Sequence, residues 1–493
     1  MRIRVYILVV TVTSALLMAS AAWLNAPLPL SQARAADAEA EKTLPPPAEI
    51  LPTARAKYLG ARSCAATACH GSAEPDTRAG RIGRNEYVYW FEHDPHARAY
   101  RALTAPKGQA MLTRLGIVAD GKVVDEAGYK NCLACHNFEP PHGERSENFY
   151  ATEGVGCEAC HGGAERWIAE HHRTALSAEQ KKSLGMTATD NLTVRAELCV
   201  RCHVGSATAD VNHDLVAAGH PPLKFELAAY CEIYPKHWSD SKERRQTADF
   251  ELQLWLQGKF AAQRAALAVQ AARAEKAADK APPGPWPEFA NYDCFACHHD
   301  LNGRGDWRPV AAADSSKVVW PAQRWYSAGF SAADRDYPVQ RDYRLQEEKL
   351  AELLERSLAP DAAEVAKAAN AAGAAWEKVV ATWPKDVAVS RKLIREELLA
   401  HAAPEVAVQD DWDTATQNYL QLAAYVRTLN DEAEKTGGAR ANNQTSTLRE
   451  LRQQLAFPLN YDSPKQFGGP LENGKSSRDA VHDRYREILR SLP

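Results

Sequence analysis

The arrangement of the cysteines constrains this chain more than any other feature. Ten of the eleven cysteines lie in five pairs, and a histidine directly follows the second cysteine of every pair. Four pairs have the spacing Cys-x-x-Cys-His, whereas the first, in SCAATACHGS, has four residues between its cysteines. The sets are Cys64/Cys69/His70, Cys132/Cys135/His136, Cys157/Cys160/His161, Cys199/Cys202/His203 and Cys294/Cys297/His298. Only Cys231 stands outside this pattern, and we interpret it as a buried thiol.

Cys-x-x-Cys-His is the attachment motif of c-type haem. The two thiols add to the two vinyl groups of one porphyrin, and the histidine becomes the proximal ligand of its iron. The competing interpretations are disulfide bonds, which are common in exported proteins, and zinc ribbons. A zinc ribbon pairs two Cys-x-x-Cys knuckles and needs no histidine after each one. Four repeats of the full motif therefore favour haem.

The wider first pair fits the same chemistry with a longer loop between the thiols, because His70 keeps its place after the second cysteine. The alternative is a disulfide between Cys64 and Cys69, or between one of them and Cys231. That alternative leaves a third cysteine unpaired and gives His70 no role. The sequence therefore predicts five covalently attached haem c groups, each with its iron.

The other eleven of the sixteen histidines are candidate distal ligands. Methionine, the other common axial ligand, is nearly absent, since only Met111 and Met186 follow the N-terminal segment. Ligation by two histidines is therefore expected at most sites, and it favours low reduction potentials. Nine of the eleven lie between residues 93 and 299, among the motifs, whereas His401 and His482 lie outside and are interpreted as surface residues.

Residues 59–203 resemble the tetrahaem cytochrome c that accepts electrons from hydroxylamine oxidoreductase, and its wider multihaem relatives. The resemblance is carried by YLGARSCAATACHGS, WFEHDPHARAYRAL, NCLACH, GVGCEACHGG, AEHHRTA and ELCVRCH. It implies distal ligands at His96, in the second of these stretches, and at His172, in the fifth. The first stretch departs from the family, in which two residues separate the cysteines. The tetrahaem relative has one high-spin haem at its second site, which implies an open face on the iron held by His136.

Beyond residue 203, the stretches VNHDLVAAGHPPLKFE and PWPEFANYDCFACHHDL resemble larger, pentahaem-type members of the same superfamily. This second resemblance implies iron ligands at His213, His220 and His299. Because neighbouring side chains point apart, His299 cannot bind the same iron as His298, but it can reach another one.

The rest of the chain divides into segments by composition. Arg2 and Arg4 precede a long apolar run, so residues 1–35 are predicted to be an export signal, either cleaved or kept as an N-terminal membrane anchor. Residues 36–58 have the composition of a flexible leader. The predicted segments that follow are a pentahaem domain at 59–310 with one long helix at about 247–281, a linker at 311–341 and a cysteine-free helical domain at 342–493.

The predicted fold is mainly α, a multihaem cytochrome c module with little β-structure plus a C-terminal helical bundle. The predicted function is electron transfer between redox-partner proteins in the periplasm, and no catalytic residue is assigned. The alternative is a haem enzyme that reduces or oxidises a small nitrogen or sulfur compound at one high-spin haem. The net charge of −4 and the lack of a basic stripe argue against nucleic acid. The helical half is expected to cap the haems or to dock a partner or a second copy.

Overall fold

The chain is mainly α-helical, which confirms the predicted fold class. The computed structural model describes residues 56–78, 83–141, 143–173, 176–279, 286–298, 320–329, 338–403, 411–437, 442–455 and 478–492. Within these ranges the only sheet is a hairpin of β1 (Val118–Ala119) and β2 (Lys122–Val123), in which Val118 pairs with Val123. The predicted signal, most of the leader and His299 lie outside the described residues. Of the helices searched within these ranges, none is long and apolar enough to cross a membrane.

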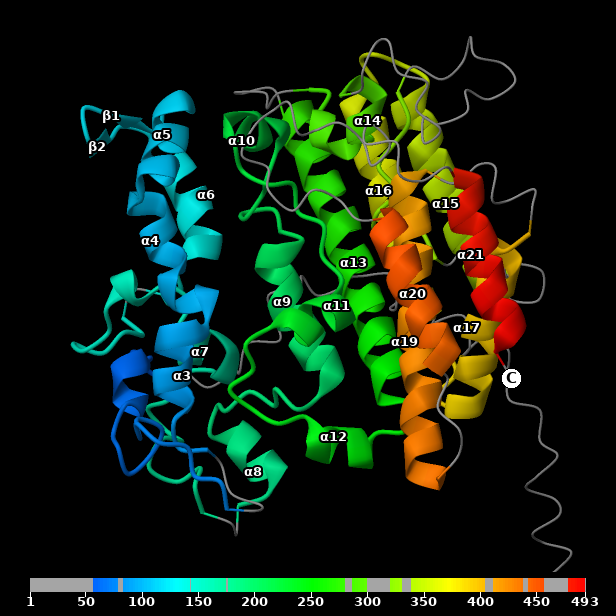
Figure 1. Cartoon of the computed structure of the whole chain (residues 1–493). Helices are drawn as coiled ribbons and strands as arrows, with labels where there is room; N and C mark the ends of the chain where they lie inside the picture. Colours follow the sequence, from blue (N-terminus) through cyan, green and yellow to red (C-terminus); the bar gives the residue numbers. More distant parts are fainter. Residues whose placement is uncertain are drawn as a thin grey trace, which may run out of the picture. The chain divides into compact units, whose positions relative to one another are not determined.

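Short helices make up the first half of the described chain (Figure 1). Several begin at a capping side chain, such as Asp125 before α6 and Asn191 before α9, which accept hydrogen bonds from backbone N–H groups of the first turn. The elements are η2 (Ala61–Cys64), α3 (Glu86–His93), η3 (Pro95–Arg98), α4 (Ala99–Thr104), α5 (Pro106–Arg114), α6 (Glu126–His136), η4 (Ala151–Glu153), α7 (Cys157–His161), α8 (Ala178–Ser183), α9 (Leu192–His203), α10 (His213–Ala218), α11 (Leu227–Ile233) and α12 (Ser241–Gln246).

Long helices follow, beginning with α13 (Phe250–Ala278), which confirms the single long helix expected at about 247–281. In Figure 1, α13 runs between the short helices and the later ones, and it packs against α9, α16 and α19. The later elements are η5 (Phe289–Asn291), α14 (Cys294–Cys297), α15 (Pro338–Glu355), α16 (Ala362–Thr382), α17 (Val387–His401), α19 (Trp412–Thr436), α20 (Asn442–Leu455) and α21 (Arg478–Ser491).

One large apolar core lies among the long helices and extends to α9 and α11. Its largest fully buried side chains include Trp255 and Trp376, and the indole N–H of Trp376 donates to the carbonyl of Phe260 at 3.0 Å. The other two apolar clusters of the described chain are much smaller and lie among the short helices. They are Ala61/Trp90/Ala97 and Leu112/Ile117/Val118. The short-helix region therefore has little core of its own, as expected if cofactors supply its apolar surface.

The interpretation of His401 and His482 as surface residues is wrong, because their exposed fractions are 1% and 5%. His401 follows Leu398 and Ile394 on the buried face of α17, and His482 lies beside Val481 on α21. The helical period of 3.6 residues places these histidines on the apolar faces. Burial, together with the nearby Lys259 and His482, lowers the pKa of His401 to about 4.

Candidate functional site

Helices present the cysteine–histidine motifs. α6 and α9 end at the motif histidines His136 and His203, and α7 consists of the motif from Cys157 to His161. Residues three and four positions apart lie on one side of a helix, so both thiols and the imidazole of a Cys-x-x-Cys-His motif face the same way. This is the arrangement that one porphyrin edge and its iron need.

All eleven cysteines lie within the described ranges, and none of them forms a disulfide. Among the described residues, no group of three or more His, Cys, Asp or Glu side chains is placed to hold a metal ion.

Each motif histidine lies opposite a second histidine. An imidazole nitrogen lies about 2 Å from the metal it binds, so two rings on opposite sides of one ion have centres about 6 Å apart. The distances between ring centres are 6.1 Å for His70–His171, 6.2 Å for His136–His220, 6.2 Å for His161–His237, 6.0 Å for His203–His96 and 6.4 Å for His298–His213. All five pairs therefore have the spacing of two axial ligands, and the residues present fit five haem irons.

The pairs agree with the resemblance at three of its proposed distal positions and differ at another. His96, His213 and His220 each lie opposite a motif histidine. At the first site it is His171, not His172, that lies opposite His70. The His171 ring packs edge-on against Trp167 at 5.1 Å, and the neighbouring His172 ring is turned 88° from it.

Sequence reasoning did not select His237, which lies opposite His161. It is the one histidine between His220 and the fifth motif. The resemblance already supplied one distal candidate for each of the five motifs, so no signal in the sequence pointed to His237. His93 is the opposite case, because its ring packs against Tyr89 at 4.8 Å, 56% of its side chain is exposed, and it lies opposite no motif histidine.

The second ring nitrogen of several paired histidines has a hydrogen-bond acceptor. Nδ1 of His136 is 2.9 Å from the carbonyl oxygen of Ala99, and Nδ1 of His220 is 2.8 Å from that of Pro221. His171 Nδ1 is 2.9 Å from the carbonyl oxygen of Ile168. Such hydrogen bonds fix the ring orientation and leave Nε2 to bind the metal.

Burial favours the neutral form of five of the ten paired rings. It is the main cause that lowers the pKa of His161 and of His203 to about 4, and a neighbouring histidine adds to the effect in each case. Burial also lowers the pKa of His171, His220 and His237. Only a neutral imidazole has a lone pair free for a metal, so these surroundings suit axial ligands.

The sites lie close to one another. The thiols of Cys64 and Cys157, from the first and third motifs, are within hydrogen-bonding distance. The Cys135 thiol of the second motif lies 3.9 Å from the carbonyl oxygen of Cys202 in the fourth. Cys199 of the fourth motif lies near Cys160 of the third. These neighbouring residues place the sites in the order first, third, fourth, second.

The fifth site joins this series through two segments. Asn131, beside the second motif, exchanges two hydrogen bonds with the backbone of Asp210, at 2.8 and 2.9 Å. Asp210 precedes His213 by three residues. The guanidinium of Arg273 on α13 bonds Asp210 at 2.7 Å and the Asn291 side chain at 2.6 Å, just before the fifth motif. Arg273 thus holds together the segments that carry both histidines of this site.

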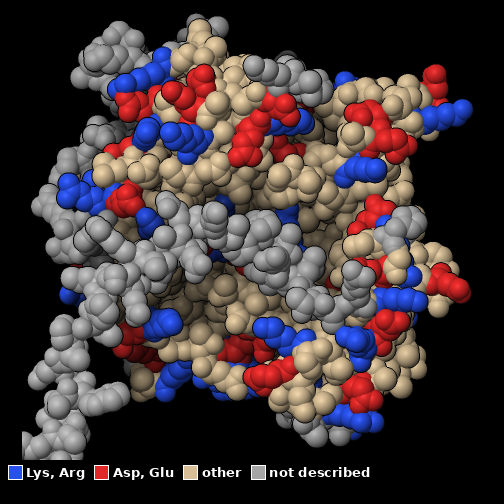
Figure 2. Space-filling model, turned by 180° about the vertical axis from the view of Figure 1, so that it is seen from behind, with Lys and Arg blue, Asp and Glu red and all other residues tan. Residues whose placement is uncertain are grey.

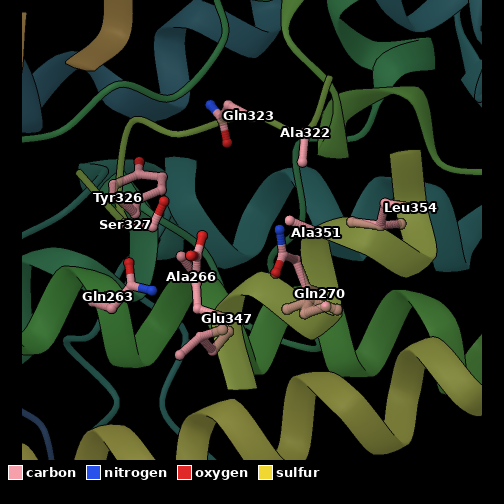
Figure 3. Close-up of a pocket in the computed structure, with 12 residues that line it drawn as sticks. Gln263, Ala266, Gln270, Ala322, Gln323, Tyr326, Ser327, Glu347, Ala351 and Leu354 are labelled. Atoms are coloured by element: carbon pink, nitrogen blue, oxygen red, sulfur yellow. The ribbon is translucent and has the colours of Figure 1, made fainter. Parts of the chain in front are cut away.

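Two other features do not belong to the sites. Burial raises the pKa of the Cys231 thiol to about 11, so it is protonated at neutral pH. The pocket in Figure 3 lies between α13, α15 and residues 320–329, and Gln263, Tyr326 and Glu347 point toward it. No cysteine and no histidine is found among the described residues that line this pocket.

The surface among the elements is hollowed on the face seen in Figure 2. Most of the visible lining is neither Lys, Arg, Asp nor Glu, and charged residues of both signs lie around it.

Residues 63–162 match the family model described as cytochrome c554 and c-prime, a stretch that includes the first three motifs. This similarity supports a c-type cytochrome, with covalently bound haem c and a part in electron transfer. No curated protein and no solved structure matches the chain.

Proposed function

We propose that this chain is a multihaem cytochrome that transfers electrons between redox-partner proteins through five covalently bound haems, each ligated by two histidines. The observation that carries the proposal is the pairing of all five motif histidines with a second histidine, at 6.0 to 6.4 Å between ring centres. Five such pairs, each containing the histidine of a haem-attachment motif, argue against a different cofactor.

Bound haem would supply one-electron redox chemistry between a reduced and an oxidised partner. The thiols would tether the porphyrins, and the paired imidazoles would supply two protein ligands for each iron. His220 lies opposite His136, at the site where the family resemblance implied an open face. With His220 as a ligand there, no iron has an open position for a substrate, which favours a carrier over an enzyme.

The contacts between sites support a continuous path. Neighbouring cysteines link the first site to the third, the second to the fourth and the third to the fourth. Electrons would pass along this series to partner proteins at its ends. We also infer that the chain works in the periplasm, because its N-terminal segment has the pattern of an export signal and haem c is attached outside the cytoplasm.

The first test is a mass spectrum and a low-temperature electron paramagnetic resonance spectrum of the oxidised protein, with and without nitric oxide. The proposal expects the mass of the chain plus five haems, only low-spin ferric signals, and no change with nitric oxide. A high-spin signal that responds to nitric oxide would instead identify an open site and favour the enzyme.

A matched pair of variants tests the ligand assignment. His171→Ala should convert one haem to the high-spin form, whereas His172→Ala should leave all five low-spin. His237→Ala should convert another, with the exposed His93→Ala as its control. If His172→Ala creates the high-spin haem and His171→Ala does not, the pairing at the first site is wrong.

A further inference from the structure

The paired histidines differ in what their second ring nitrogen contacts. At the second site both imidazoles face neutral carbonyl oxygens, of Ala99 and Pro221. At the third site, Nδ1 of His237 is buried and has no hydrogen-bond partner among the described residues. At the first and fourth sites, one imidazole faces a carboxylate instead.

The carboxylate of the first site belongs to Glu86. Its Oε2 lies 2.9 Å from Nδ1 of the proximal His70, and the two side chains are 17% and 27% exposed. The other oxygen, Oε1, accepts a hydrogen bond from the backbone N–H of Arg84 at 3.1 Å. Glu86 is the first residue of α3, where the helix dipole favours a negative charge. The carboxyl group is therefore fixed in place beside the imidazole.

The carboxylate of the fourth site belongs to Asp94, which is 1% exposed. Its Oδ1 lies 3.0 Å from Nδ1 of the distal His96 and also accepts the backbone N–H of His96 at 2.9 Å. Its Oδ2 accepts a hydrogen bond from the hydroxyl of Tyr234. Asp94 is thus a buried carboxyl group held between an imidazole and a phenol.

A carboxylate acceptor changes what an imidazole gives to a metal. It draws the Nδ1 proton toward itself, so the ring becomes a more basic ligand. A more basic ligand stabilises ferric over ferrous iron and lowers the reduction potential, and hydrogen bonding around the axial ligands is one of the ways in which a protein sets this potential. A carbonyl oxygen has a weaker effect because it carries no net charge.

We propose that Glu86 and Asp94 are positioning residues that lower the reduction potentials of the first and fourth haems relative to the third. The proposal rests on the five-haem function above. The third site adjoins both of the others, through Cys64 and Cys157 on one side and Cys160 and Cys199 on the other. An electron that enters at the first haem would then pass to the third, which lies between two lower-potential sites.

The test is a potentiometric titration of the intact five-haem protein, followed by optical and paramagnetic resonance spectra. Glu86→Gln should raise the potential of one haem and Asp94→Asn that of a different one. At a fixed potential, each variant should change the ratio of reduced to oxidised iron about tenfold. This corresponds to a shift of about 59 mV in the reduction potential of a one-electron couple. The resonance signal of the same haem should shift with its potential, because the ligand field changes.

Glu92→Gln is the matched control, because it removes the same charge from α3 at a side chain that is 60% exposed and bonds no paired histidine. Tyr234→Phe tests the fourth site in the opposite direction. Without the phenol, Asp94 becomes a stronger acceptor for His96, and the potential should fall. The Tyr234→Phe variant can also test the role of Asp94 if Asp94→Asn does not fold.

The outcomes separate the two proposals. If the unaltered protein lacks five low-spin haems, the proposed function fails. If it has them and the potentials in the Glu86 and Asp94 variants match those of Glu92→Gln, this inference alone is overturned. A fall with Asp94→Asn, or a rise with Tyr234→Phe, would also overturn it at the fourth site.

Discussion

The short-helix region that carries most of the haem motifs and the bundle of long helices are stabilised in different ways. The bundle buries one continuous apolar core, with Trp255 and Trp376 almost fully enclosed. Before α9, the short-helix region has two clusters of three buried residues each. Hydrophobic burial drives folding roughly in proportion to the apolar area removed from water. The bundle can thus fold on its own side chains, whereas the region before α9 depends on the apolar area that the haems contribute.

The largest effect is expected from removing the haems. Replacing the ten paired cysteines by serine, in the full chain, should leave the segment before α9 unfolded, because its two small clusters cannot offset the conformational entropy of some 130 residues. The bundle should keep its helices. Limited proteolysis with mass spectrometry of the fragments measures this directly.

The conservative control is the single Cys231→Ser variant, which should keep its haems and resist the protease throughout. Protease resistance of residues 56–191 in the haem-free chain would contradict the comparison, because the region would then need no cofactor.

The next effect lies within the bundle core. Trp376 is fully buried, and its ring contacts those of Tyr343 at 4.7 Å and Phe260 at 5.9 Å between centres. Trp376→Ala should lower the free energy of unfolding of the bundle by about 3–5 kcal/mol, through lost burial and the cavity left behind. Urea unfolding followed by circular dichroism measures it.

The haem absorption band of the same samples should change little before the bundle unfolds. Leu358→Ala is the control, because that side chain is 57% exposed and should shift the midpoint by less than about 0.5 kcal/mol. Equal effects of the two variants would show that Trp376 is not part of a core.

The sequence was most informative where chemistry requires fixed spacing. Two thiols and one imidazole must meet one porphyrin, so the motifs alone predict the five proximal positions. Distal ligands come from distant segments, and nothing local separates His171 from His172 or distinguishes His237. Those choices depend on contacts such as the packing of His171 against Trp167. His401 is a different case, since the helical periodicity of α17 was present in the sequence and was overlooked.

A smaller effect is expected where the two regions meet at the fifth site. Arg273 reaches from α13 to Asp210 and Asn291, and its side chain is 13% exposed. Arg273→Leu should cost about 2 kcal/mol in unfolding free energy, the usual value of hydrogen bonds to charged groups. In a fraction of the molecules the haem at the fifth site should also become high-spin, because the segments that carry His213 and His298 lose their common support.

Thermal unfolding and the paramagnetic resonance spectrum together check this prediction. Lys276→Leu, an exposed position near the end of the same helix, should change neither. A destabilised protein with five unaltered low-spin signals would show that Arg273 supports the bundle but not the haem site.

The smallest effect concerns a charge inside the bundle, Lys259 on α13. Its amino group donates to the backbone carbonyls of Tyr326 and Ala328, and burial lowers its pKa to about 7, against the opposing influence of Glu226 and Glu347. Between this value and the ordinary lysine pKa near 10.5, the unfolded chain binds a proton that the native state does not. Stability should therefore rise with pH over that window.

The expected rise is about 1 kcal/mol in the unfolding free energy of the bundle between roughly pH 7.5 and 8.5, since one proton changes this energy by at most about 1.4 kcal/mol per pH unit. Lys259→Met should flatten the slope, whereas Lys276→Met should leave it unchanged. Urea titrations at the two pH values measure the unfolding free energy of each variant. The difference between Lys259→Met and Lys276→Met cancels the contribution of the titratable groups that both variants share. Because the lysine lies in the bundle core and not beside a haem motif, the haem spectra should be the same at both pH values. A pH slope that survives in Lys259→Met would mean that Lys259 stays charged where it is buried, held by Glu226 and Glu347.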